Sequence, residues 1–325
     1  MHILIVNGTP IPALRYGGTE RVIWDLGKAL VAAGHRVSYL VPAGSSCPFA
    51  PVLPLQPDVA WNAQIPADVD VVHFQFHPKQ TIDKPCLMTE HGNARKRKPL
   101  PLNTVFVSHN HAQRHGSAHC VLNGLDWAAY GEVDFAQPRK HVHFLGKGAW
   151  SVKNLRGAIQ VALQAGMELD VLGADRFQFK RGIRLTLSRH IHFHGMVGGA
   201  EKNRLLNGSR AMVFPVRWHE PFGLAIIESL YFGCPVFATP YGAIPEIVSS
   251  EFGYLATSAS ELARALTSID RFDPRACHQH ARTNFSAQRM AQDYVRYYER
   301  ILEGETLHTE PVHILEPGRD LPWTR

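Results

Sequence analysis

The chain has 325 residues, of which 45% are hydrophobic and 19% are charged. A domain usually takes about 150 residues, so this length predicts roughly two globular domains, and the composition excludes a disordered chain or a coiled coil. The 34 lysines and arginines exceed the 28 acidic residues and give a formal net charge of +6, which favours anionic partners such as nucleotides, phosphorylated sugars, nucleic acid or lipid surfaces.

No apolar run reaches the length of about 18 residues that crosses a membrane, and the N-terminal sequence MHILIVNGTP has no basic segment and no cleavage site. We therefore expect neither a signal peptide nor a spanning helix. The five cysteines are widely spaced and never form a C-x-x-C pair, which argues against a disulfide framework or a zinc knuckle. A cytoplasmic location is the matching expectation.

Short apolar segments alternate with helical segments along the first part of the chain. These predicted strands are ILIV at 3–6, RVSYLV at 36–41, VDVVHFQF at 69–76, PCLMTE at 85–90 and NTVFVS at 103–108. Strands that alternate with helices predict an α/β domain built on a parallel sheet.

A second series of the same kind follows. Its predicted strands are HVHFLG at 141–146, LDVLG at 169–173, HIHFHG at 190–195, AMVFPV at 211–216 and PVFAT at 235–239. The polar stretch 135–140 separates the two series, so we place one domain at 1–138 and another at 139–285. Ligands of open parallel sheets bind beyond the carboxyl ends of the strands, where the functional motifs should lie.

The segment 286–302 predicts a helix with a wide face to bury. Its apolar and aromatic positions are Met290, Tyr294, Tyr297, Tyr298 and Ile301. The segment 303–325 has prolines and charges but no periodicity, and we expect it to be irregular.

The sequence FPVRWHEPFGL at 214–224 carries the strongest local signal. It predicts a strand, a loop that contains Glu220, and a helix that begins at Pro221 or Phe222, since proline is favoured in the first helical turn. The first amides of such a helix bind anions such as a pyrophosphate. The residues concerned are Phe222, Gly223 and Leu224. Glu228 would lie about 9 Å along the helix axis from Phe222, a distance that suits a ribose beyond the phosphates.

Glu220 and Glu228 are separated by seven residues, and Pro-Phe-Gly-Leu follows the first glutamate. This pattern resembles the E-x7-E motif of the retaining nucleotide-sugar glycosyltransferases of family 4, which have the GT-B fold. Further matches occur in the same order, and together they cover roughly residues 1–302. They are Tyr16 to Glu20, Val121 to Asp126, Leu145 to Lys147 with Lys153, and Thr239 to Val248.

The resemblance implies a GT-B fold, with two Rossmann-like domains whose parallel sheets face each other across a cleft. The first domain would hold the acceptor and the second the nucleotide-sugar. The helix at 286–302 would cross back to the first domain. Retention of anomeric configuration is also implied by the resemblance alone.

A leaving diphosphate gains negative charge as its bond to the sugar breaks, and fixed cations stabilise that charge. The resemblance places Lys147 and Lys153 in this role. Lys147 replaces the arginine of the family, so it keeps the charge and loses the bidentate fork. The resemblance further implies that Glu220 holds sugar hydroxyls and that Glu228 holds the ribose.

Other positions of the donor site are implied in the same way. Gly17 and Gly18 follow the first strand and would let the loop approach the donor phosphate and the acceptor, whereas the full G-x-G-x-x-G fingerprint of an NAD dehydrogenase is absent. His91 would contact the donor sugar, either by donating to a hydroxyl or by holding a charge near the phosphate. The loop that borders the base would be Gly195, Met196 and Val197.

His190, His192 and His194 alternate along one predicted strand and so face one side. The sequence places no cysteine or carboxylate cluster near them to complete a metal shell, and the family needs no metal. We therefore expect no metal and no cofactor apart from the nucleotide-sugar as co-substrate.

A basic run lies in a stretch that has no Asp or Glu between His91 and His119. The run consists of Arg95, Lys96, Arg97 and Lys98. It is either a solvated loop or the binding place of an anionic acceptor, small or lipid-linked, which would bring the protein to a membrane surface. No aromatic residues interleave with the run, so a nucleic-acid partner is not expected.

The expected function is the transfer of a hexosyl-type group from a nucleoside-diphosphate sugar to an acceptor hydroxyl, with Glu220, His91 and Lys153 as the catalytic residues. A nucleotide-sugar 2-epimerase, which shares the GT-B architecture, and a non-catalytic nucleotide-binding protein are the alternatives. Incubation with the donor alone separates the first alternative, because an epimerase turns over without an acceptor.

Overall fold

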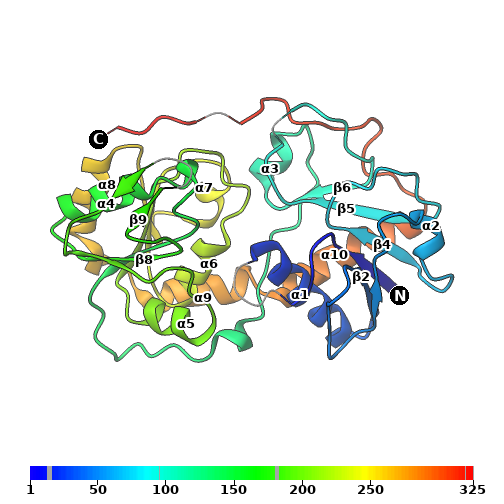
Figure 1. The fold of residues 1–325 in the computed structure, drawn as a ribbon, viewed down its shortest axis with the longest axis horizontal. Coiled ribbons are helices and arrows are strands. Elements are labelled where there is room, and N and C mark those ends of the chain that lie inside the picture. The colour runs from blue at the N-terminus through cyan, green and yellow to red at the C-terminus, as the bar shows by residue number, and fades with distance from the viewer. Residues whose placement is uncertain (13–16, 95, 180–182, 319, 325) are drawn as a thin grey trace. The chain divides into compact units, whose positions relative to one another are not determined.

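The computed structural model describes residues 1–12, 17–94, 96–179, 183–318 and 320–324 (Figure 1). Its contacts divide the chain into two compact units, of which the first comprises 1–127 with 285–317 and the second 128–284 with 318–325. The division falls before Ala128 rather than at 138, because Tyr130 and Gly131 are held by hydrogen bonds to Glu228 and Tyr231 of the second unit.

In the described part of the first unit, six parallel strands form one sheet in the order β3-β2-β1-β4-β5-β6. The strands are β1 His2–Val6, β2 Arg36–Val41, β3 Val52–Pro54, β4 Val71–Phe74, β5 Cys86–Glu90 and β6 Thr104–Phe106. All residues of β1 are buried, which explains its continuous apolar run, since parallel strands are covered on both faces. The edge strand β3 was not indicated by the apolar pattern.

Two long helices of the first unit pack on each other, and one of them comes from the C-terminal part of the chain. The helices of this unit are α1 Gly18–Ala32, α2 Trp61–Gln64, α3 His109–Gln113 and α10 Ala287–Leu302. Helix α10 lies against α1 and β5. Its buried Tyr294 and Tyr298 form hydroxyl hydrogen bonds with Thr89 at 2.9 Å and with His73 at 2.8 Å, respectively.

The second unit has a parallel sheet of the same topology in the order β11-β8-β7-β12-β13-β14. Its strands are β7 Val142–Leu145, β8 Leu169–Leu172, β11 Ile191–Phe193, β12 Ala211–Phe214, β13 Val236–Ala238 and β14 Gly253–Leu255. A small antiparallel pair, β9 Phe177–Gln178 and β10 Arg184–Leu185, lies outside this sheet. The sequence did not indicate β14 or this pair, because part of each strand is exposed or half-buried and no continuous apolar run marks it.

Helices follow most strands of the second unit. They are α4 Leu155–Gln164, α5 Gly199–Asn207, α6 Leu224–Tyr231, α7 Ile244–Ile247, α8 Ala259–Leu266 and α9 Pro274–Asn284. Short 3-10 turns occur at Trp127–Tyr130, Ser151–Lys153 and Ile269–Arg271.

The strand order of each sheet reverses beside its first strand. In the first unit β1 lies between β2 and β4, and in the second β7 lies between β8 and β12. Ligands of doubly wound sheets bind beyond the carboxyl ends of the strands at this point. The loops that leave β7 and β12 are therefore where a ligand of the second unit is expected.

Candidate functional site

Lys153 and Glu220 meet where these two loops come together. Lys153 ends the 3-10 turn after β7, and Glu220 lies in the loop after β12. The Lys153 Nζ atom is 2.7 Å from Glu220 Oε2, and the two side chains are 12% and 8% exposed. The indole Nε1 of Trp218 donates to the same carboxylate oxygen at 2.8 Å. The carboxylate of Glu220 is thus fixed by two donors.

Aromatic rings also surround the Lys153 ammonium. Its Nζ lies 5.1 Å from the ring centroid of Phe214 and 4.9 Å from that of Trp218. Cation–π attraction adds to the ion pair at such distances. The ammonium is therefore held in place before any ligand binds, as electrostatic stabilisation of a developing anion requires.

The backbones of the two loops are joined by hydrogen bonds. Asn154 adopts the left-handed conformation at φ 53° and caps helix α4, and its Nδ2 donates to the Pro215 carbonyl at 2.8 Å. The Arg217 amide donates to the Val152 carbonyl at 2.7 Å. These bonds couple the position of Lys153 to that of the β12 loop.

A glycine holds the main chain of Glu220 in place. Gly242 has φ +70°, and a Cβ atom there would lie 2.3 Å from both the backbone N and the backbone O of Glu220. The next amide, of Ala243, donates to the Glu220 carbonyl at 2.9 Å. Because of this close approach, only glycine fits at position 242.

If Glu220 has the role that the sequence resemblance implies, Gly242→Ala should displace it and abolish most sugar transfer. The matched control is Gly166→Ala, because Gly166 has φ +66° and a Cβ atom there would meet no heavy atom of the described residues within 4 Å. Both substitutions should cost about 1–3 kcal/mol of backbone strain, seen as a lower melting temperature, whereas only Gly242→Ala should lower kcat/KM for the donor. Equal transfer rates in the two variants would contradict the role assigned to Gly242.

Helix α6 begins later than the sequence predicted. The predicted start at Pro221 or Phe222 is wrong, because Gly223 at φ +103° precedes the first helical residue, Leu224. The amide of Phe222 therefore belongs to the loop, and the helix start is formed by Leu224 and the residues after it. The Phe222 side chain is buried and anchors the loop. Anion binding by the amides of Phe222, Gly223 and Leu224 stays a prediction.

Glu228 is 2% exposed and lies in a polar cluster of the second unit. Its Oε1 accepts a hydrogen bond of 2.8 Å from the Tyr130 hydroxyl and forms an ion pair with Lys202. The Lys202 Nζ is also 4.9 Å from the centroid of the Tyr130 ring. Since a buried charge needs a partner, Glu228 has a structural role that the sequence did not indicate, and its contact with a ribose stays a prediction.

The remaining donor-side residues lie near the ends of β7 and β11. The Lys147 Nζ is 5.4 Å from the ring centroid of Trp150. Gly195 has φ +64°, and its carbonyl accepts from the Gly173 amide at 2.7 Å. Met196 is exposed and Val197 is half-buried.

The predicted residues of the first unit lie at the start of α1 and at the end of β5. Gly17 is the N-cap of α1, and Gly18 is its first residue. The His91 Nε2 is 2.8 Å from Gln75 Oε1, so it donates to this oxygen and the lone pair is on Nδ1. Burial lowers the pKa of His91 to about 4. The ring is therefore neutral near neutral pH, and Nδ1 can accept a hydrogen bond from a hydroxyl.

Of the basic run, Arg95 lies outside the described residues. Lys96, Arg97 and Lys98 are exposed. The Arg97 guanidinium donates to the Leu315 carbonyl at 2.7 Å, so it holds the segment that follows α10 on the first unit.

The expectation that no carboxylates lie near the histidines of β11 is wrong. The His192 Nε2 is 2.5 Å from Glu168 Oε2, and the His194 Nε2 is 2.7 Å from Asp170 Oδ1. The sequence did not indicate this contact, because Glu168 is 24 residues from His192 and Asp170 is 24 residues from His194 along the chain. The parallel pairing of β11 with β8 brings them alongside, with His192 opposite Asp170.

Comparison with known families places the site inside one domain. Residues 135–269 match the family model described as glycosyl transferases group 1. Residues 135–269 are therefore similar to the group 1 glycosyl transferases. The matched range contains Lys147, Lys153, Glu220 and Glu228, so both loops of the candidate site belong to it.

Solved structures share the fold of this chain over nearly its whole length. AviGT4, a glycosyltransferase involved in avilamycin A biosynthesis, is 22% identical with a TM-score of 0.75, over 94% of this chain and 99% of that one. Sucrose-phosphate synthase from Thermosynechococcus elongatus is 17% identical with a TM-score of 0.71, over 94% and 100%. HepE from Anabaena, in complex with UDP and glucose, is 15% identical with a TM-score of 0.62, over 91% and 99%. The predicted GT-B fold with two parallel sheets is confirmed. Each sheet has six strands, one more than the sequence indicated.

A curated relative matches over a shorter range. It is an uncharacterized 41.2 kDa protein in the cps region of Klebsiella pneumoniae, 23% identical over 117 residues. The match spans 34% of this chain and 32% of the length of that relative.

The described residues include no helix that is both long and apolar enough to cross a membrane. All five cysteines lie in the described part of the chain, and none of them forms a disulfide.

Proposed function

We propose that the chain transfers a sugar from a nucleoside-diphosphate sugar to an acceptor hydroxyl, with retention of anomeric configuration. The observation that carries this proposal is the ion pair of Lys153 with Glu220, which lies beyond the carboxyl ends of β7 and β12 in the range that is similar to the group 1 glycosyl transferases. This is the position where a doubly wound sheet binds its ligand.

In this proposal the diphosphate of the donor binds beside the Lys153 ammonium, with Lys147 and the amides at 222–224 as further positive partners. The contact with Lys153 strengthens as the bond between sugar and phosphate breaks, because the phosphate oxygen then gains charge. Glu220 accepts hydrogen bonds from the hydroxyls of the sugar, and Glu228 those of the ribose. Loop residues 195–197 border the base.

The first unit supplies the contacts to the sugar and the acceptor. His91 accepts a hydrogen bond from a sugar hydroxyl at Nδ1, since its Nε2 is bound to Gln75. Gly17 and Gly18 let the start of α1 approach the donor phosphate. We further propose that the enzyme is cytoplasmic and that its acceptor is a small or lipid-linked molecule.

A ligand screen followed by product analysis tests the proposal. The full chain is heated with UDP, GDP, ADP and their sugars, since a ligand that binds the native state raises the melting temperature. We place UDP-sugars first, because the similar HepE structures contain UDP or UDP-glucose. Proton NMR of the product with an acceptor should show the anomeric configuration of the donor. Sugar turnover without an acceptor would instead indicate an epimerase, and nucleotide binding without sugar release a non-catalytic protein.

The exposed lysines of the basic run give a prediction about the acceptor. If the acceptor is anionic, the double variant with Lys96→Ser and Lys98→Ser should raise the acceptor KM at low ionic strength by roughly fivefold or more, since each surface lysine near an anionic partner contributes on that scale. The wild-type KM should rise with salt as charges are screened, and the variant should show a flatter salt dependence.

The control for this prediction is Lys79→Ser, because Lys79 is an exposed lysine of the same unit outside the basic run. Arg97 is left unchanged, since it holds Leu315. The same acceptor KM in the double variant, the control and the wild type would show that the run is only a solvated loop.

A further inference from the structure

Histidines and carboxylates gather at the amino ends of three neighbouring strands of the second unit. His141 directly precedes β7, Glu168 directly precedes β8, and His192 is the middle residue of β11. The three strands are adjacent in the order β11-β8-β7. The cluster therefore lies at the opposite edge of the sheet from Lys153 and Glu220, which follow the carboxyl ends of their strands.

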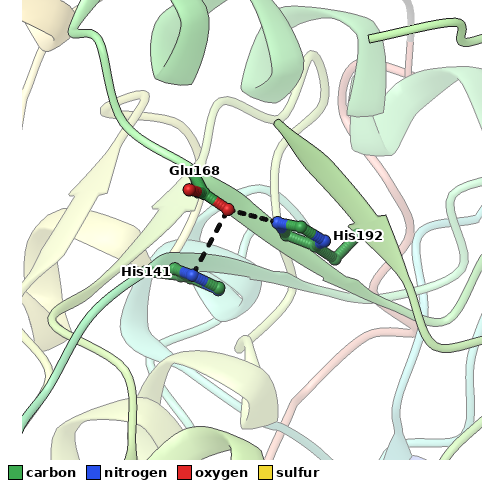
Figure 2. Close-up of side chains that lie close together, drawn as sticks. All are labelled: His141, Glu168 and His192. Atoms are coloured by element: carbon green, nitrogen blue, oxygen red, sulfur yellow. Dashed lines mark hydrogen bonds and ion pairs between the residues drawn. The ribbon is translucent and has the colours of Figure 1, made fainter. Parts of the chain in front are cut away.

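The ligand atoms of these three side chains face one another (Figure 2). The Glu168 Oε2 atom is 2.5 Å from His192 Nε2 and 3.4 Å from His141 Nε2. One ligand atom from each residue lies within 4.8 Å of the other two. The side chains of His141, Glu168 and His192 are 29%, 45% and 36% exposed, so an ion from solvent can reach them.

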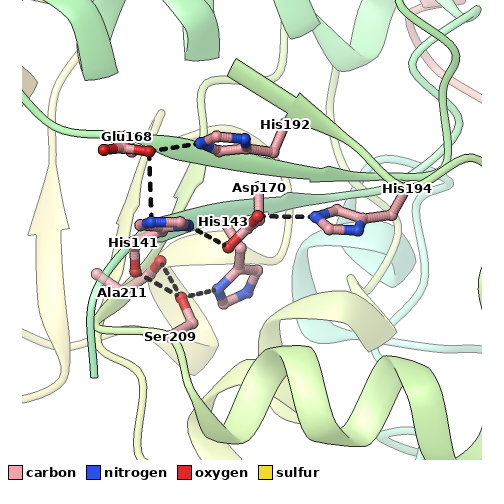
Figure 3. A network of polar contacts seen from close by, with 8 residues as sticks. All are labelled: His141, His143, Glu168, Asp170, His192, His194, Ser209 and Ala211. Atoms are coloured by element: carbon pink, nitrogen blue, oxygen red, sulfur yellow. Dashed lines mark hydrogen bonds and ion pairs between the residues drawn. The ribbon is translucent and has the colours of Figure 1, made fainter. Parts of the chain in front are cut away.

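A second carboxylate sets the orientation of one imidazole (Figure 3). The Asp170 Oδ2 atom accepts from His141 Nδ1 at 2.9 Å, and Asp170 Oδ1 accepts from His194 Nε2 at 2.7 Å. When His141 is neutral and its proton is on Nδ1, its lone pair is on Nε2 and faces the Glu168 carboxylate 3.4 Å away. Two electron-rich atoms that face each other in this way create a place for a cation. Carboxylates that fix the tautomer of a histidine in this manner are a regular feature of metal sites.

We propose that His141, Glu168 and His192 bind a zinc ion, with solvent completing its coordination shell. Two imidazoles and one carboxylate are ligands that zinc accepts, whereas magnesium and calcium prefer oxygen ligands throughout. Zinc–nitrogen bonds of about 2.0–2.1 Å place tetrahedral ligand atoms about 3.3 Å apart. The rings of His141 and His192 are stacked at 12°, so these half-exposed side chains have to tilt toward each other when the ion binds. A neutral His192 that binds zinc through Nε2 carries its one proton on Nδ1, so the proton now donated from Nε2 to Glu168 has to move to the other ring nitrogen.

The bound ion links β7, β8 and the edge strand β11. It should stabilise the second unit without touching the reacting atoms, because it lies at the amino edge of the sheet. Zinc binding at this site does not depend on the proposed transfer reaction. Either proposal can therefore be disproved while the other stands.

Zinc titration of the full chain tests this site. After treatment with EDTA and dialysis, calorimetry with zinc chloride should show one tight equivalent, and zinc should raise the melting temperature, whereas magnesium should not. His141→Gln and His192→Gln should each weaken zinc binding at least about tenfold. Asp170→Asn should weaken it about 10- to 100-fold, because Asp170 orients the His141 imidazole. The melting temperature of each variant without metal shows that it is folded.

The matched control is His190→Gln, since His190 is exposed, belongs to the same histidine-rich segment and is not one of the three ligands. It should bind zinc as the wild type does. With 19 histidines in the chain, weak binding of several ions that is equal in all variants would be nonspecific and would overturn the proposal. Loss of binding in His190→Gln without loss in His141→Gln would overturn the ligand set.

Discussion

Lys153→Met is expected to lower kcat for sugar transfer by about 100-fold to 1,000-fold, the loss typical of removing one preorganised electrostatic donor. Methionine keeps an unbranched apolar side chain and removes the ammonium that lies 2.7 Å from Glu220 and near the rings of Phe214 and Trp218. If this ammonium acts on the leaving diphosphate, its contact is stronger in the transition state than with the bound donor. The value of kcat should then fall at least as steeply as donor affinity.

The measurement is the initial rate of nucleoside-diphosphate release over a range of donor concentrations, well below the melting temperature of the variant. Lys153→Arg serves as the control, because it keeps a positive charge beside Glu220, and it should recover part of the lost kcat. Trp218 still donates to the Glu220 carboxylate in both variants, so the position of the carboxylate should change little. An unchanged kcat/KM in Lys153→Met would remove Lys153 from the mechanism.

The fold was predictable because its strands are buried on both faces. Buried parallel strands such as ILIV at 3–6 and AMVF at 211–214 form continuous apolar runs, and these runs stand out from the helices between them. The strands that escaped prediction are short edge or hairpin strands, such as Val52–Pro54 and Gly253–Leu255. Most of their residues are exposed or half-buried, so no continuous apolar run marks them.

The resemblance to the family identified individual residues of the candidate site. It did not indicate which of these residues contact one another. Lys153 and Glu220 are 67 residues apart, and only the pairing of β7 with β12 brings their loops together. Nothing local indicates that Gly242 must be a glycine, because the atoms it would strike belong to Glu220. The start of α6 was misplaced for a different reason, since the preference of proline for a first helical turn is overridden by the left-handed Gly223.

Glu228→Gln is expected to lower the free energy of unfolding of the second unit by about 3–5 kcal/mol, the usual cost of breaking a buried ion pair on one side. The Lys202 side chain is only 10% exposed and pairs with this carboxylate, so the substitution removes the counter-charge of a buried ammonium. Urea-induced unfolding followed by circular dichroism measures the loss. Lys202→Met should cost a similar amount, because it leaves the carboxylate of Glu228 with the Tyr130 hydroxyl.

The double variant of Glu228→Gln with Lys202→Met should lose less than the sum of the two single losses, because neither charge of the ion pair remains in it. Additive losses would contradict the structural role of the pair.

The same variants separate this role from the proposed contact with the ribose. If Glu228 also binds the ribose, Glu228→Gln should weaken the binding of a free nucleoside diphosphate more than Lys202→Met does at equal stability. Glu220→Gln should leave that affinity nearly intact and abolish transfer, since Glu220 is proposed to contact only the sugar. Equal losses of diphosphate affinity in the Glu220 and Glu228 variants would contradict the division of roles between the two glutamates.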